Sequence, residues 1–210
     1  MKFEKALEKI IKQIEKIRKQ AEVTRFCRDL EDKKVSYTQA LRLEELSEKL
    51  VLLTRTLPAY TGAVNASKDV ENIIDKEVPV DICFTDEGWF KLKIPCILPR
   101  KEHGSVDYIR GFLYPKMRDY FDRHEPVRFK DCVIIYRFVY DKERPERRII
   151  DHDNYEINAV TDIVALYLLP DDAPKFCNLY YTTYRYEYDA TEVFIVPGKD
   201  FTRWIKKYEL

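Results

Sequence analysis

The sequence predicts an α+β fold in which a small mixed sheet, flanked by helices, follows an N-terminal antiparallel helical hairpin. Three observations support this prediction. Apolar residues recur at alternating steps of three and four through much of the first 57 residues, as they do in paired helices. Several segments after residue 78 alternate apolar and polar residues, as half-buried strands do. A helix-length segment, residues 155–169, lies between two of those strands.

Residues 1–60 are expected to form the helical hairpin, with a charged connection near residues 28–34. Ser36 and Gln39 have the spacing of a capping box at the start of the second helix, and Pro58 should end it. The hairpin could pack within the chain, or it could be an arm for dimerisation or for a protein partner. The predicted seams are Phe3, Leu7, Ile10, Ile14, Ile17 and Ala21 in the first helix, and Leu43, Leu46, Leu50, Leu53 and Leu57 in the second.

The rest of the chain divides into a linker with a short helix, residues 61–77, and an α/β domain, residues 78–210. The segment 131–140 is strongly apolar and is expected to be a central strand. In the segment 179–188, one face of the expected strand carries Tyr180, Thr182, Tyr184, Tyr186 and Tyr188. These tyrosines could stack on bases or pack against protein. The other expected elements are strands at 78–84, 89–97, 179–188 and 191–196, and helices at 105–124, 155–169 and 201–208.

Composition narrows the class of protein. With 45% hydrophobic residues the chain should fold, and its formal net charge of zero disfavours strong nonspecific binding to nucleic acid. No apolar run is long enough to span a membrane, so we expect no membrane partner. The five cysteines show no close pairing, which is typical of reduced thiols in the cytoplasm. Cys83, Cys96, Cys132 and Cys177 lie in or beside strand-like segments and are expected to be buried.

The best candidate site is acidic. In an extended segment Asp151 and Asp153 would point to the same side. The following helix would carry the chain about 22 Å away, so Asp172 could join them only if that helix packs obliquely or if a second subunit supplies it. Together the three carboxylates would suit Mg²⁺ or Mn²⁺. The competing interpretation is that Asp153 or Asn154 caps the helix and that Asp172 belongs to a turn.

The motif Asp-x-Asp-Asn, followed by a helix and then by a second acidic pair, resembles the signature of the RusA-type Holliday-junction resolvases. The similarity covers about residues 85–200. It implies that Asp151, Asp153 and Asp172 are catalytic metal ligands, and that a homodimer cuts branched DNA. The family's catalytic lysine has no match, because Ile157 and Asn158 occupy its expected position. A metal-dependent, structure-selective endonuclease with weakened activity is therefore the predicted function.

Lys101, Arg147 and Arg148 are the candidate phosphate-binding residues, since they lie in a proline-bounded loop or directly before the acidic motif. Arg147 and Arg148 could equally neutralise their acidic neighbours. The alternative function keeps the scaffold without the chemistry: a noncatalytic accessory, inhibitor or interaction protein. The DHDNYE and LPDD blocks also resemble those of uncharacterised proteins from bacterial mobile elements.

Overall fold

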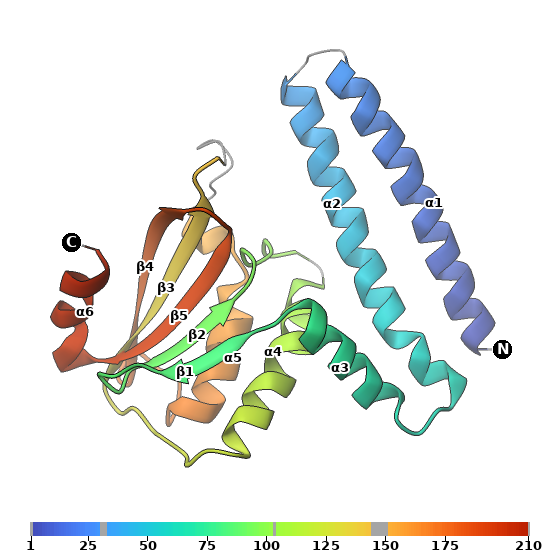
Figure 1. Cartoon of the computed structure of the whole chain (residues 1–210). Coiled ribbons are helices and arrows are strands. Elements are labelled where there is room, and N and C mark those ends of the chain that lie inside the picture. Colours follow the sequence, from blue (N-terminus) through green and yellow to red (C-terminus); the bar gives the residue numbers. More distant parts are fainter. Residues whose placement is uncertain (1, 30–32, 103, 144–150, 210) are drawn as a thin grey trace. The chain divides into compact units, whose positions relative to one another are not determined.

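The computed structural model describes residues 2–29, 33–102, 104–143 and 151–209. The chain divides between Asn72 and Ile73 into two compact units, which we call the helix unit and the sheet unit (Figure 1). The described residues form six α-helices and one five-stranded mixed sheet, so the predicted α+β class is confirmed. No helix among them is long and apolar enough to cross a membrane.

In the helix unit, α1 (Lys2–Asp29) and α2 (Lys33–Thr56) lie side by side and run antiparallel (Figure 1). The side-chain amide of Gln13 donates to the carbonyl oxygen of Leu46 at 2.7 Å, and that of Gln20 donates to the Gln39 side chain at 2.8 Å. The short helix η1 (Pro58–Thr61) and the start of α3 (Ala66–Glu77) follow. The more buried positions of α1 are Phe3, Ala6, Ile10, Gln13, Ile17, Gln20, Thr24 and Cys27.

This row corrects the seam predicted for the first helix. Leu7 and Ile14 are 36% and 49% exposed, and Ala21 is exposed as well. The prediction counted only apolar residues as seam positions, because glutamine is rarely a core residue. In the structure two glutamines are buried in the seam with hydrogen-bond partners. The predicted capping box is also wrong, because α2 begins at Lys33 and Ser36 lies inside it.

The sheet has the strand order β1-β2-β5-β3-β4. All neighbours are antiparallel except β3 and β4, which are parallel and connected through helix α5. A parallel pair needs such a crossover because a tight turn would bring the second strand back antiparallel to the first. The strands are β1 (Asp81–Phe84), β2 (Phe90–Ile94), β3 (Cys132–Asp141), β4 (Cys177–Tyr186) and β5 (Ala190–Pro197).

Helices cover the two faces of the sheet unequally. Helices α4 (Ser105–Phe121) and α5 (Ile157–Leu168) pack together on one face, where the Tyr136 hydroxyl lies 2.7 Å from the Thr161 hydroxyl. On the other face the short helices η4 (Gly198–Asp200) and α6 (Phe201–Tyr208) follow β5, and Trp204 packs with Ile135 and Phe194. Successive residues of β3 therefore bury their side chains in opposite cores, which explains why this strand is apolar at nearly every position.

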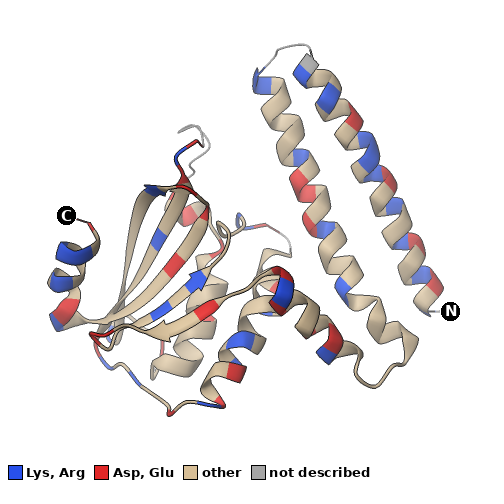
Figure 2. Ribbon diagram, viewed as in Figure 1, with Lys and Arg blue, Asp and Glu red and all other residues tan. Residues whose placement is uncertain are grey.

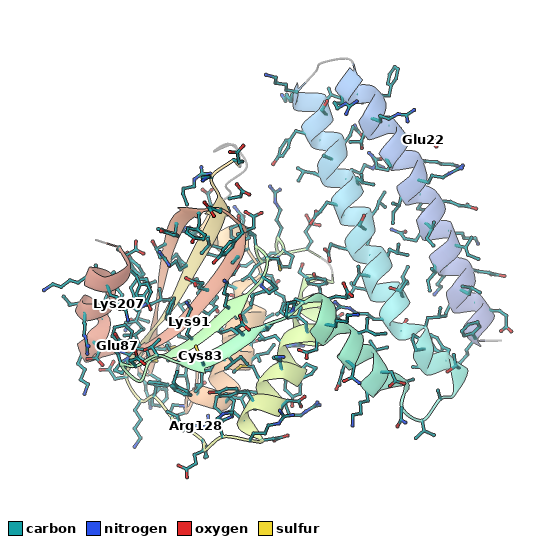
Figure 3. The ribbon with its side chains drawn as sticks, viewed as in Figure 1. Glu22, Cys83, Glu87, Lys91, Arg128 and Lys207 are labelled. Carbon is teal, nitrogen blue, oxygen red and sulfur yellow. The ribbon has the colours of Figure 1, made fainter. Side chains whose placement is uncertain are left out.

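Helix α6 forms an ion pair with the turn between β1 and β2. Lys207 donates to Glu87 at 2.7 Å, and Figure 3 shows the two residues at the same end of the sheet. Hydrogen bonds from Lys207 and Thr85 lower the pKa of Glu87 to about 2. Among the strand-associated cysteines, Cys132 and Cys177 are buried as expected, whereas Cys96 is half-buried and Cys83 is exposed. Burial raises the pKa of both buried thiols, that of Cys132 to about 12, so neither is a ready nucleophile.

Candidate acidic site and the edge of the sheet

The acidic segment begins where the chain returns to the sheet after β3. Asp151 precedes a single turn of 3-10 helix, η3 (His152–Asn154), so the predicted extended geometry of Asp151 and Asp153 is wrong. Both carboxylates are exposed. The amide of Asn154 donates to the carbonyl oxygen of Asp151 at 3.0 Å, which closes the turn. The two carboxylates therefore sit on a tight turn at the surface.

An aromatic stack holds this turn against the sheet. The His152 ring stacks on Phe138 at a centroid distance of 5.1 Å and on Tyr181 at 5.8 Å. One of its ring nitrogens, Nε2, lies 3.0 Å from the Thr183 hydroxyl. Partial burial lowers the pKa of His152, while the nearby carboxylates of Asp151 and Asp153 act in the opposite direction. The imidazole is thus a positioning group for the acidic turn, a role that the sequence pattern alone did not reveal.

Asp172 lies near the start of β4, whereas the acidic turn contacts Thr183 farther along that strand. The Cys177 thiol donates to the Asp172 carbonyl oxygen at 3.4 Å, and Cys177 is the first residue of β4. His152 contacts Thr183, and the distance from Cys177 to Thr183 is about 20 Å along an extended strand. Within one chain the oblique packing that would unite Asp172 with Asp151 and Asp153 does not occur.

The described residues contain no group of three or more His, Cys, Asp or Glu side chains placed to hold a metal ion. Because Asp172 lies near the start of β4 and the acidic turn contacts Thr183, one chain does not bring the three predicted ligands together. The competing capping interpretation is also revised, because Glu156 and not Asp153 or Asn154 caps α5. Its side chain accepts from the Ala159 amide at 3.4 Å.

Of the predicted phosphate-binding residues, Lys101 does come close to the acidic turn. Its backbone amide donates to the carbonyl oxygen of Asn154 at 3.0 Å, and its side chain is exposed. The adjacent Arg100 forms an isolated β-bridge with Tyr155, so the proline-bounded loop runs alongside the acidic segment. Arg147 and Arg148 lie outside the described residues.

A second polar cluster lies on the sheet face shared with α6. The Arg137 guanidinium donates to Glu192 at 3.0 Å and lies 4.0 Å from the centroid of the Tyr184 ring. Lys91, labelled in Figure 3, pairs with the same Glu192 at 2.8 Å. Arg137 also lies 3.9 Å from the Glu209 carboxylate, so two cations face two carboxylates. The cluster joins strands β2, β5, β3 and β4 without presenting a strongly charged surface.

The predicted tyrosine face of β4 is divided between two environments. Tyr180 packs edge-on against Phe201 and Trp204 of α6. Beyond the helix, Tyr184, Tyr186 and Tyr188 are each 41–43% exposed and contact one another. Among the strands that the structure describes, β4 pairs only with β3, so its other side is an edge of the sheet.

Comparison with known proteins identifies a family for this chain but no function. No curated protein shows detectable sequence similarity to the chain. A family model does match, and it extends over both units, from residue 1 to residue 209. The chain therefore belongs to the family of unknown function DUF6100.

Proposed function

We propose that this chain is a noncatalytic interaction protein, in which an N-terminal antiparallel helical hairpin of α1 and α2 binds a helix of another protein. The observation that carries the proposal is an exposed apolar stripe on α1. It comprises Leu7, Ile11 and Ile14, which are 36%, 48% and 49% exposed. Their spacing of four and three residues places them on one side of the helix.

The stripe is supported by the composition of the seam beside it. Gln13 and Gln20 occupy buried positions between α1 and α2, while apolar side chains of similar size remain outside. Buried polar residues specify the register of paired helices at a cost in stability. Singly exposed apolar residues are ordinary, but a contiguous row is typical of a surface that another protein covers.

A row of lysines follows α1 on the side away from the apolar stripe, since successive residues of a helix are about 100° apart. Lys5, Lys9, Lys12, Lys16 and Lys19 are all exposed, and Figure 2 shows the basic residues distributed along the helix. Amphipathic helices commonly dock through apolar anchors spaced by three and four residues. The partner we propose is therefore an amphipathic helix that supplies apolar anchors to the stripe.

The proposal is tested by amine cross-linking of the full chain in the cells that produce it, followed by mass spectrometry. Lysines of α1 should cross-link to another polypeptide. The triple substitution Leu7→Gln, Ile11→Gln and Ile14→Gln should remove those cross-links without reducing helicity measured by circular dichroism. The matched control, Glu8→Gln, Glu15→Gln and Glu22→Gln, changes exposed residues of the same helix and should keep them. Cross-links that survive the apolar substitutions would overturn the proposal.

The second candidate is the RusA-like, metal-dependent endonuclease acting on branched DNA as a homodimer. One observation favours it: the acidic turn and Asp172 lie toward opposite ends of the same edge strand. A two-fold related copy paired along that edge would direct its Asp172 toward Asp151 and Asp153 of the first copy. The separation of these carboxylates within one chain is thus compatible with a site shared between two copies.

A synthetic four-way junction distinguishes the two candidates. The noncatalytic protein leaves the junction intact with Mg²⁺ or Mn²⁺, whereas the endonuclease cuts it and stops when a chelator is added. If the carboxylates are shared between copies, Mg²⁺ should raise the melting temperature of the native protein, and Asp153→Asn should abolish that rise. Asp69→Asn, in α3 of the helix unit, is the matched control and should leave the metal response unchanged.

A further inference from the structure

On the outer side of the edge strand β4, alternate residues have no backbone partner among the described residues. The Lys142 amide donates to the Tyr186 carbonyl oxygen at 2.7 Å, and the Cys132 amide donates to that of Phe176 at 3.1 Å. In a parallel ladder, alternate residues of a strand bond to the same neighbour. The even-numbered residues of β4 therefore bond to β3. Leu179, Tyr181 and Thr183 direct their amide and carbonyl groups away from the sheet.

This edge carries few of the features that prevent strand pairing. Short strands, prolines, lysines and bulges normally protect an edge. The opposite edge strand, β1, is protected by its length of four residues. In contrast, β4 has ten residues in continuous register with β3 and contains neither proline nor lysine. The two edges of one sheet thus differ in their capacity to accept another strand.

We propose that β4 pairs antiparallel with β4 of a second copy of this chain, about a two-fold axis at Tyr181. Each copy then contributes the same three outward-facing residues, as an isologous contact requires. Leu179 lies opposite Thr183 of the partner subunit, and Tyr181 lies opposite Tyr181 of the partner subunit. Each of these pairs exchanges two backbone hydrogen bonds, and the two sheets become one continuous sheet.

Charge complementarity favours a second copy as the occupant. In this register Arg185 lies opposite Cys177 of the partner subunit. The carboxylates of Asp171 and Asp172 lie near Cys177, where they help to raise the pKa of its thiol. Arg185 is half-buried on the same strand, and its guanidinium donates to the Asp141 carbonyl oxygen at 3.3 Å. The two-fold axis therefore places a guanidinium near an acidic pair at both ends of the ladder.

The pairing goes beyond the binding role proposed for α1, and it stands whether or not the chain cuts DNA. The shared arrangement of Asp172 with Asp151 and Asp153 depends on it, because only an antiparallel copy reverses the two ends of β4. An extended segment of a different protein could also add to this edge. In that case the isolated chain would remain monomeric.

The test is the oligomeric state of the full chain, measured by light scattering after size-exclusion chromatography over a wide concentration range. The native chain should be dimeric. Leu179→Lys with Thr183→Lys places like charges opposite each other twice, and dimerisation should weaken about tenfold. Leu179→Lys with Thr183→Glu places opposite charges at the same two positions and should restore the dimer. The second variant is a matched control, because it alters the same residues in the same number.

Amide hydrogen exchange provides a measurement that needs no substitution. The amides of Leu179, Tyr181 and Thr183 should exchange slowly at high protein concentration and quickly on dilution, while those of Tyr180 and Thr182 stay protected throughout. A native chain that is monomeric at every concentration would overturn the proposal. The proposal would also fail if Leu179→Lys with Thr183→Lys left dimerisation unchanged, or if both double variants weakened dimerisation equally.

Discussion

The two units of the chain bury their side chains to very different extents. In the sheet unit, nine of the ten residues of β3 are buried, and Trp89, Trp204 and Phe194 are inaccessible to solvent. In the helix unit, α2 has 24 residues and none of them is buried. The difference indicates where stability resides. The sheet unit has a closed core, whereas the helix unit taken by itself leaves apolar side chains exposed.

The largest expected effect is a truncation in the core of the sheet unit. Trp204→Ala should lower the free energy of unfolding by about 3–5 kcal/mol, because it leaves a cavity between α6 and strands β3 and β5. Urea denaturation followed by the fluorescence of Trp89 measures this, since both tryptophans belong to the sheet unit. Trp204→Phe keeps most of the volume and should lose less. Equal losses for the two variants would contradict a tightly packed core.

A smaller effect of opposite sign is expected in the helix unit. Gln13→Leu should raise the free energy of unfolding of this unit by about 1 kcal/mol, because an apolar side chain suits the seam better than a buried amide. Gln13→Ala loses both the hydrogen bond to Leu46 and the packing, and it should be destabilising. Thermal melting followed by far-ultraviolet circular dichroism reports on this unit. If Gln13→Leu lowered the melting temperature instead, the seam would depend on its polar contacts.

The smallest effect concerns the acidic turn. The pKa of His152 is lower in the folded chain than its ordinary value of 6.5, so the unfolded chain binds more protons as the pH falls through that value. Stability supplied by the neutral ring is therefore complete above pH 6.5 and decreases below it. His152→Gln should flatten the pH dependence of the melting temperature in this range. An unchanged slope would show that the ring titrates alike in both states.

The same contrast between the units separates what sequence could predict from what it could not. Helix α6 occupies residues 201–208 as predicted, and β3 matches its prediction within one residue at each end. Both elements follow from strong local periodicity over a buried surface, which constrains a segment before its neighbours are known. The alternating faces of β4 were predictable for the same reason, since Tyr180 lies on the α6 face and Tyr181 on the other.

The seam of α1 was not predictable from periodicity, because two interleaved sets of residues fit the same spacing. The apolar set, with Leu7 and Ile14, has the better hydrophobic pattern, but the set with Gln13 and Gln20 faces α2. Hydrogen-bond partners on the neighbouring helix decide this, and they become apparent only when the helices are placed together.

For the acidic residues, the sequence by itself determined their identity, their spacing and the helix between them. Only the tertiary structure decided their positions, because the parallel pairing of β3 and β4 sends α5 back along the sheet and leaves Asp172 far from Asp151 and Asp153. Local patterns depend on forces within a few residues, whereas strand direction and strand order depend on the burial of both faces of the whole sheet.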